Sequence, residues 1–236
     1  MSDSQIIKNH AAFIWSVADL LRGDYKQSEY GKVVLPLTVL RRLDCVLEPT
    51  KEKVLEKAKS LKGKIENQEP VLCAVAKEQF FNTSKLDMKK LLDDPTNLAA
   101  NLRSYISAFS SGARDVLEKF DFDTQIARMD KANILYMVIS KFAEIDLHPS
   151  VIDNHTMGSI FEELLRRFSE MSNETSGEHF TSRDIVKLLV SLVFSENVGN
   201  LKGEGIIRSM FDPCCGTGGI LTIGKKWVKE NISEDI

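Results

Sequence analysis

The sequence predicts a mainly α-helical chain, with a helical N-terminal domain followed by the beginning of an α/β domain. Three observations support this. Apolar residues recur at helical spacing through the first 145 residues, a short apolar run lies at 206–211, and an acid and a glycine-rich turn follow that run. The length of 236 residues suffices for one large or two modest domains, and 43% hydrophobic residues suffice for a packed core. We expect the helical domain to span 1–149 and the second domain 150–236, because His148-Pro149 should end a helix.

Periodic apolar residues predict several helices in the N-terminal domain, the clearest at 5–21, 32–47, 95–109 and 126–145. The first should end at Gly23-Asp24, and Pro36 must lie in the first turn of the second or kink it. Asp94 is expected to cap the third helix, with Pro95 as its first residue, and Asp123 precedes the fourth.

The charge balance argues against a chain that coats DNA by itself, since 31 Lys and Arg stand against 34 Asp and Glu, a net charge of −3. Locally, residues 51–64 hold six lysines with only Glu52 and Glu56 between them. This segment either lies along a phosphate backbone or is a solvated helix face with Glu–Lys pairs. We favour the second interpretation because no aromatic residues are interleaved. The arginine pairs 41–42 and 166–167 could face DNA or a partner subunit, but such pairs usually solvate a helix face.

Cysteine usage and hydropathy indicate a cytoplasmic, reduced protein without a membrane partner. The four cysteines have no C-x-x-C spacing, so no metal site is expected. Cys214 and Cys215 are expected to be small packing residues rather than a disulfide. No apolar run approaches the length of a membrane span, and the first residues lack a signal-peptide core.

The most informative stretch is 211–219, Phe-Asp-Pro-Cys-Cys-Gly-Thr-Gly-Gly. Ile206, Ile207, Met210 and Phe211 predict a buried strand before it, and the apolar residues after 219 predict a helix. In doubly wound α/β sheets such a turn lets a ligand approach backbone N–H groups at the helix N-terminus. Its spacing differs from the dinucleotide pattern G-x-G-x-x-G and is similar to the first motif of S-adenosylmethionine-dependent DNA amino-methyltransferases. Another nucleotide fold, or a glycine-rich turn without a ligand, remains an alternative.

A second segment, 174–190, predicts another helix N-terminus with an unusual entry loop. Thr181 and Asp184 have the spacing of a capping box, and an apolar face follows them. The loop residues 177–180, Gly-Glu-His-Phe, are not explained by capping. Packed beside the glycine turn, this helix would close a cofactor pocket from the other side. His179 alone is more often a polar loop residue than a catalyst.

Together, four segments resemble the modification subunit of type I restriction-modification systems. They are Asp-Leu-His-Pro (146–149), Asp-Asn-His-Thr-Met-Gly-Ser-Ile-Phe-Glu-Glu-Leu-Leu-Arg-Arg-Phe (153–168), Gly-Glu-His-Phe-Thr-Ser-Arg-Asp (177–184) and Phe-Asp-Pro-Cys-Cys-Gly-Thr-Gly-Gly-Ile-Leu (211–221). The resemblance implies a Rossmann-like methyltransferase domain that binds S-adenosylmethionine through Glu178, His179, Phe180, Thr181, Ser182, Arg183, Asp212, Thr217, Gly218 and Gly219. The family usually has proline where Ser182 stands, which should loosen that turn slightly.

The resemblance also implies an activity and partners. Members of the family methylate the exocyclic amine of adenine in double-stranded DNA, with the base flipped out of the duplex and without a metal. They act with a specificity subunit, and with a motor-nuclease restriction subunit when they restrict. The helical domain is then expected to serve assembly and DNA clamping.

One departure limits what this chain does alone. The family's Asn-Pro-Pro-aromatic motif is absent from residues 1–236, and the acid expected about twenty residues beyond the glycine motif would lie past Ile236. We therefore assign no catalytic residue and expect an N-terminal part of the subunit, inactive by itself. Two alternatives stay open: a non-catalytic assembly or DNA-binding module, and a methyltransferase for a protein or small molecule.

Overall fold

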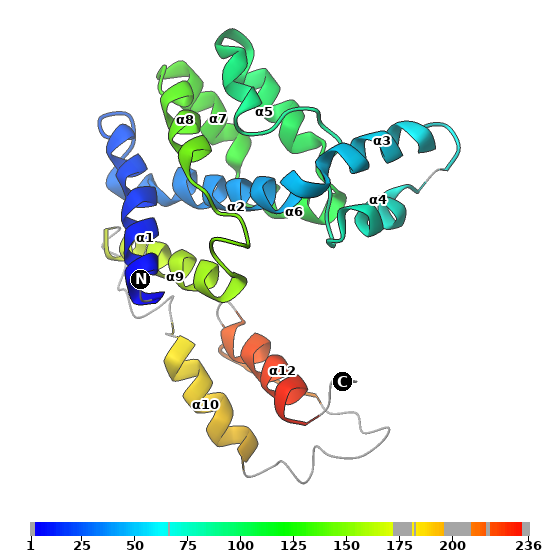
Figure 1. The fold of residues 1–236 in the computed structure, drawn as a ribbon. Coiled ribbons are helices and arrows are strands. Elements are labelled where there is room, and N and C mark those ends of the chain that lie inside the picture. Colours follow the sequence, from blue (N-terminus) through cyan, green and yellow to red (C-terminus); the bar gives the residue numbers. More distant parts are fainter. Residues whose placement is uncertain are drawn as a thin grey trace. The chain divides into compact units, whose positions relative to one another are not determined.

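The computed structural model describes residues 3–65, 67–171, 181, 183–195, 209–215 and 218–232 (Figure 1). Short 3-10 turns lie between several of its helices: η1 (Gln27–Glu29), η2 (Glu48–Thr50), η3 (Lys90–Asp93) and η4 (Pro95–Asn97). The α-helices are α1 (Asp3–Leu20), α2 (Gly31–Leu47), α3 (Lys51–Leu61), α4 (Glu69–Ala76), α5 (Leu98–Ser107), α6 (Ser111–Glu118), α7 (Phe122–Lys131), α8 (Leu135–Glu144), α9 (Asn154–Met171), α10 (Arg183–Ser195) and α12 (Gly219–Asn231). The expectation of a mainly helical chain is confirmed.

The chain divides into two compact units, unit 1 at 1–172 and unit 2 at 173–236. This division lies later than the expected boundary at 149/150, because α9 packs on α1 and α2 of unit 1. The ring of Phe168 near the end of α9 lies 5.0 Å from the ring of Trp15. A methyl group added at Gly31 would also lie 3.4 Å from Cγ of Phe168, so the start of α2 lies close against the same ring.

Helix α2 is the central element of unit 1 and contacts α1, α7, α8 and α9 (Figure 1). Its sequence is apolar around most of its circumference, which is typical of a buried helix. Pro36 lies inside the helix, past its first turn, and is buried. The fully buried apolar residues of α2 include Val33, Val34, Leu37 and Leu40.

Two of the expected helix boundaries depend on a single residue. Asp94 caps η4 as expected, since its Oδ1 accepts a hydrogen bond from the N–H of Asn97 at 3.2 Å, and α5 follows. The single helix expected over 126–145 is wrong, because the structure has two helices, α7 and α8, there. The chain turns between them at Asn133, whose φ of 57° lies in the left-handed region that asparagine tolerates better than most residues.

The prediction that Arg41 and Arg42 solvate a helix face is wrong, since they are only 6% and 9% exposed. Arg41 Nε donates to the carbonyl of Ile145 at 2.7 Å. Arg42 donates to the carbonyls of Leu147 and, at 2.8 Å, Ile152. The two guanidinium groups thus hold the connection between α8 and α9 against α2. Their hydrogen bonds satisfy backbone carbonyls that would otherwise lack donors.

The expected α/β part is not seen among the described residues, which contain isolated β-bridges but no strand. The start of the expected strand, including Ile206 and Ile207, lies outside them. The prediction that Met210 and Phe211 are buried is wrong: they are 39% and 86% exposed, because the described part of unit 2 offers helices but no neighbouring strand to cover them. No helix within the described ranges combines the length and hydropathy needed to cross a bilayer.

Candidate cofactor site

The described part of unit 2 contains two helices, α10 and α12, that pack against each other. Near their first turns, a methyl group added at Gly219 would lie 3.8 Å from Cγ2 of the buried Val186. Near their last turns, the rings of Phe194 and Trp227 stack with centroids 5.3 Å apart. The helices therefore run side by side in the same direction, as Figure 1 also shows. Both N-termini, each with a partial positive charge, lie at the same end of the pair.

In the middle of α12, Gly224 lies close to Met210 in the segment before the glycine turn. A Cβ atom on Gly224 would lie 2.8 Å from Sδ of Met210 and 3.2 Å from the ring of Phe194. Only glycine fits there without a shift of its neighbours. Gly224 thus lets α12 lie against the segment that carries Asp212.

The glycine turn joins Asp212 to α12 through a series of short hydrogen bonds. Asp212 Oδ1 accepts from the N–H of Cys214 at 3.0 Å, and the N–H of Gly218 donates to the carbonyl of Cys215 at 2.7 Å. Gly218 has a φ of 78°, a conformation that favours glycine, and its carbonyl accepts from both the N–H and the hydroxyl of Thr222. These hydrogen bonds order the described residues at both ends of the turn.

Two features of this turn fit a polar ligand. Asp212 Oδ2 is buried, and among the described residues it is an acceptor without a donor. Within the part of the chain that the structure describes, no side chain caps the first turn of α12, and no heavy atom lies within 4 Å of a Cβ placed on Gly218. An acceptor and a group of helix N–H donors therefore stand at the two ends of one turn, and a zwitterionic group would satisfy both.

The residues expected to bind the cofactor are only partly described. Glu178, His179, Phe180, Ser182 and Thr217 lie outside the described residues. Among the others, Thr181 is exposed and Arg183 begins α10, so both belong to the end of the helix pair where Asp212, Gly218 and Gly219 form the turn. Their role in cofactor binding stays a prediction.

Sequence reasoning missed or misplaced three residues of this turn. Thr222 was not singled out, although a threonine four residues after Gly218 is well placed to bond to that carbonyl. Cys214 and Cys215 were expected to be packing residues, but both are exposed. They form no disulfide, as expected.

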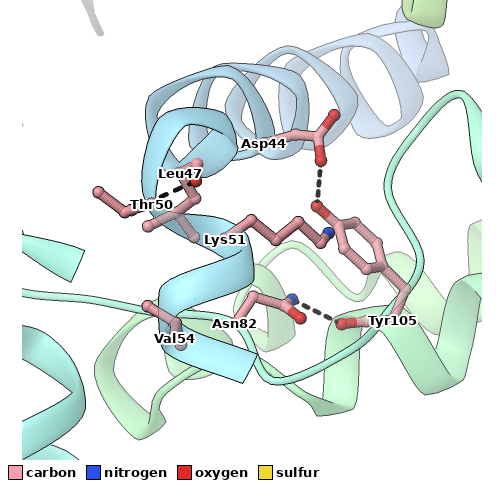
Figure 2. Close-up of a pocket in the computed structure, with 7 residues that line it drawn as sticks. All are labelled: Asp44, Leu47, Thr50, Lys51, Val54, Asn82 and Tyr105. Carbon is pink, nitrogen blue, oxygen red and sulfur yellow. Dashed lines mark hydrogen bonds between the residues drawn. The ribbon is translucent and has the colours of Figure 1, made fainter. Parts of the chain in front are cut away.

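An enclosed pocket in unit 1 is too small to be an alternative ligand site (Figure 2). Its volume is about 10 Å³, room for one water molecule at most. Asp44 Oδ1 accepts from the hydroxyl of Tyr105 at 2.7 Å, and Asn82 donates to the carbonyl of Tyr105 at 3.0 Å. Lys51 donates to the carbonyl of Leu86, and its Nζ lies 5.2 Å from the Tyr105 ring centroid. Burial lowers the pKa of Lys51 and raises that of Tyr105. The hydrogen bond from Tyr105 to Asp44 and the contact of Lys51 with the Tyr105 ring join α2, α3 and α5 as a structural network.

Comparison with known proteins divides the chain earlier than its two compact units do. The model of the HsdM N-terminal domain matches residues 10–142, more than half of the chain, and the model of N-6 DNA methylases matches residues 152–236. Helix α9 thus lies in the part matched by the methylase model, although it packs into unit 1.

Two curated relatives are methylase subunits of type I restriction enzymes. The MjaIX methylase subunit of Methanocaldococcus jannaschii is 23% identical over 227 residues, which cover 87% of this chain and 37% of the relative. The EcoEI methylase subunit of Escherichia coli is 30% identical over 135 residues, 57% of this chain and 25% of the relative. The chain therefore spans well under half the length of these relatives. From these matches, the chain belongs to the family of modification (methylase) subunits of type I restriction enzymes, in the part that joins the HsdM N-terminal domain to the N-6 DNA methylase domain.

Proposed function

We propose that the subunit carrying this chain transfers a methyl group from S-adenosylmethionine to the exocyclic amine of adenine in specific DNA sequences. One observation carries the proposal: the glycine turn before α12 combines Asp212 Oδ2, which has no partner among the described residues, with a helix N-terminus that none of their side chains caps. The turn lies within residues matched by the N-6 DNA methylase model. The sequence and the geometry of this turn support the same ligand chemistry.

The groups in the turn fit the amino-acid end of S-adenosylmethionine. Its ammonium group would donate to Asp212 Oδ2, and its carboxylate would accept from the backbone N–H groups that begin α12 at Gly219. Gly218 leaves open space beside the backbone for this approach. The loop residues 178–183 would close the pocket from the side of α10, with the ring of Phe180 against the cofactor. When bound, the cofactor supplies a methyl group on a sulfonium, which is already activated for transfer.

The partners follow from the same assignment. We propose that the subunit acts on double-stranded DNA together with a specificity subunit, and with a motor-nuclease restriction subunit in the complete enzyme. A chain with a net charge of −3 needs a partner to select a DNA sequence, since phosphate contacts carry no sequence information. The cytoplasm, where DNA and reduced thiols occur together, is the expected location.

Methyl transfer with product analysis tests the proposal. A complete modification subunit carrying residues 1–236 is mixed with a specificity subunit, duplex DNA and S-adenosylmethionine labelled on its methyl group. We expect label in DNA, recovered as N6-methyladenine after digestion to nucleosides, and no label in DNA with the 236-residue chain alone. Label on cytosine, on protein or on a small molecule, or no transfer by the complete complex, would contradict the proposal.

A further inference from the structure

The positive charge of the chain is concentrated in one segment of unit 1. Residues 51–90 contain ten lysines and six acidic residues, a net charge of +4 in a chain whose net charge is −3. Such an asymmetry indicates a surface for a negatively charged partner. Not all of these lysines are available, because Lys51 belongs to the buried network and Lys90 pairs with Asp87 at 3.0 Å.

On α3, two lysines and two glutamates form like-charge pairs at a spacing of four, and the exposed Lys59 lies on the side of the glutamates. Lys53 and Lys57 stand four residues apart on one face, and Glu52 and Glu56 stand four residues apart on the adjacent face. A helix stabilised by its own charges has opposite signs at this spacing, whereas like charges destabilise it by about 0.2–0.5 kcal/mol per pair. Spacings of three bring Glu56 near Lys53 and Lys59, but along 51–61, all of it described, no ion pair forms within the helix. The expected Glu–Lys pairing is therefore wrong.

We call Lys53 and Lys57 the lysine stripe. Both side chains are exposed, and the exposed Lys62 and Lys64 follow in the turn after α3. Val54 and Leu61 of α3 are buried, so the helix is anchored while the stripe stays in solvent. Helices α3 and α4 lie at the end of unit 1 away from α1 and α9 (Figure 1). The stripe is thus accessible on a projecting part of the unit.

We propose that the lysine stripe contacts the phosphate backbone of duplex DNA. The proposal rests on the proposed function, which supplies DNA as the substrate. Flexible lysines at a regular helical spacing suit closely spaced phosphates, and such contacts need no base recognition. A protein partner fits less well, because lysine is depleted in protein interfaces and α3 exposes no large apolar residue that could form an interface core.

The test compares two double variants of the same helix. Lys53→Gln/Lys57→Gln removes the stripe, and Glu52→Gln/Glu56→Gln removes the adjacent acidic pair as a matched control. Each is made in the complete modification subunit, assembled with its specificity subunit, and its affinity for duplexes with and without the recognition sequence is measured between 50 and 200 mM salt. Circular dichroism melting and sedimentation report folding and subunit assembly.

We expect the lysine variant to weaken binding to both duplexes by the same factor. The decrease of log affinity with log salt should become less steep by about 1.8, about 0.9 per lost phosphate contact. The ratio of the wild-type affinity to the variant affinity should therefore narrow about twelvefold between 50 and 200 mM. The glutamate variant should keep the wild-type slope. Melting, assembly and methyl transfer at saturating DNA should stay unchanged in both.

Three results would overturn the inference: an unchanged slope in the lysine variant, the same loss in both variants, or a loss of subunit assembly, which would assign the stripe to a protein partner. If the lysine variant has a less steep salt dependence than wild type but the wild-type complex transfers no methyl group, the proposed function is contradicted and the DNA contact of the lysine stripe is supported. A wild-type complex that binds no DNA would overturn both.

Discussion

Arg42 Nη2 donates a hydrogen bond of 2.7 Å to Oδ1 of Asn154, a residue 112 positions later in the chain. The same guanidinium bonds to the carbonyls of Leu147 and Ile152. One buried side chain of α2 thus orders the connection into α9 and the first residue of that helix. This contact explains why α9 belongs to unit 1 although the methylase model covers it.

Arg42→Ala should lower the free energy of unfolding by about 2–4 kcal/mol, because it leaves buried carbonyls without a donor. Arg42→Lys should recover little of this, since one ammonium lacks the planar fork that reaches three acceptors. Urea unfolding followed by circular dichroism measures the change. Arg22→Ala, which removes an exposed pair with Asp19, is the control and should cost less than about 1 kcal/mol. Equal costs for Arg42→Ala and Arg22→Ala would show that the Arg42 contacts are not structural.

Phe168→Ala should destabilise unit 1 by about 3–5 kcal/mol, because it removes a ring that packs on Trp15 in the core. Phe211→Ala is a matched control, since its ring is 86% exposed and should change stability by about 0.5 kcal/mol or less. Calorimetric melting measures both. A Phe168→Ala protein as stable as the Phe211→Ala protein would mean that α9 does not belong to the packed core.

At acidic pH, the contribution of Glu163 to the stability of the folded state should be lost. Hydrogen bonds from Arg166, and then from Arg167, hold the pKa of the Glu163 carboxyl below its ordinary value of 4.5. A lowered pKa in the folded state stabilises the fold above about pH 4.5, and this stabilisation is lost as pH falls through the lowered pKa. Glu163→Gln should therefore be less stable than wild type at pH 7 and equal to it near pH 2. Urea unfolding across this range tests the sign, and a difference that grows toward low pH would contradict it.

Gly218→Val should abolish binding of S-adenosylmethionine by a complete subunit. A branched side chain is strained at a φ of 78° and would occupy the open space beside the backbone. Gly63→Val is the matched control, because Gly63 has a φ of 77° and equally open surroundings in unit 1. Both variants should lose similar stability. A calorimetric titration of S-adenosylmethionine into each then distinguishes the effect of backbone strain from the effect of filling the cofactor site. Equal cofactor binding by the two variants would show that the pocket lies elsewhere.

The N-terminal helices could be predicted because their apolar spacing is local information. The first helix is expected at 5–21 and observed at Asp3–Leu20, and the second at 32–47 is observed at Gly31–Leu47. The break at Asn133 was missed because apolar periodicity continues across it, and only its left-handed backbone reveals the turn. The burial of Arg41 and Arg42 could not be foreseen, because it depends on carbonyls about a hundred residues away.

For the candidate site, the sequence predicts the residue types and their order but not their burial. Asp212, Gly218, Gly219 and the following helix occur as expected, and Gly218 occupies the N-cap position of α12 in the left-handed conformation. The unpartnered oxygen of Asp212 and the packing of Val186 near Gly219 depend on tertiary contacts that no local pattern encodes. The exposure of Phe211 was missed for the same reason, since an apolar run is buried only where other elements cover it.

The most direct test of the account is a calorimetric titration of S-adenosylmethionine into a complete subunit with Asp212→Asn. Asparagine keeps an oxygen for the N–H of Cys214 and replaces the unpartnered Oδ2 by an amide that donates. The wild type should bind in the micromolar range, about 8 kcal/mol, and the variant about ten- to a hundredfold more weakly with unchanged melting. Asp153→Asn, at a carboxylate that accepts from the N–H of Thr156 in unit 1, should bind like wild type. Equal affinity of Asp212→Asn and wild type would contradict the assignment of this turn to the cofactor.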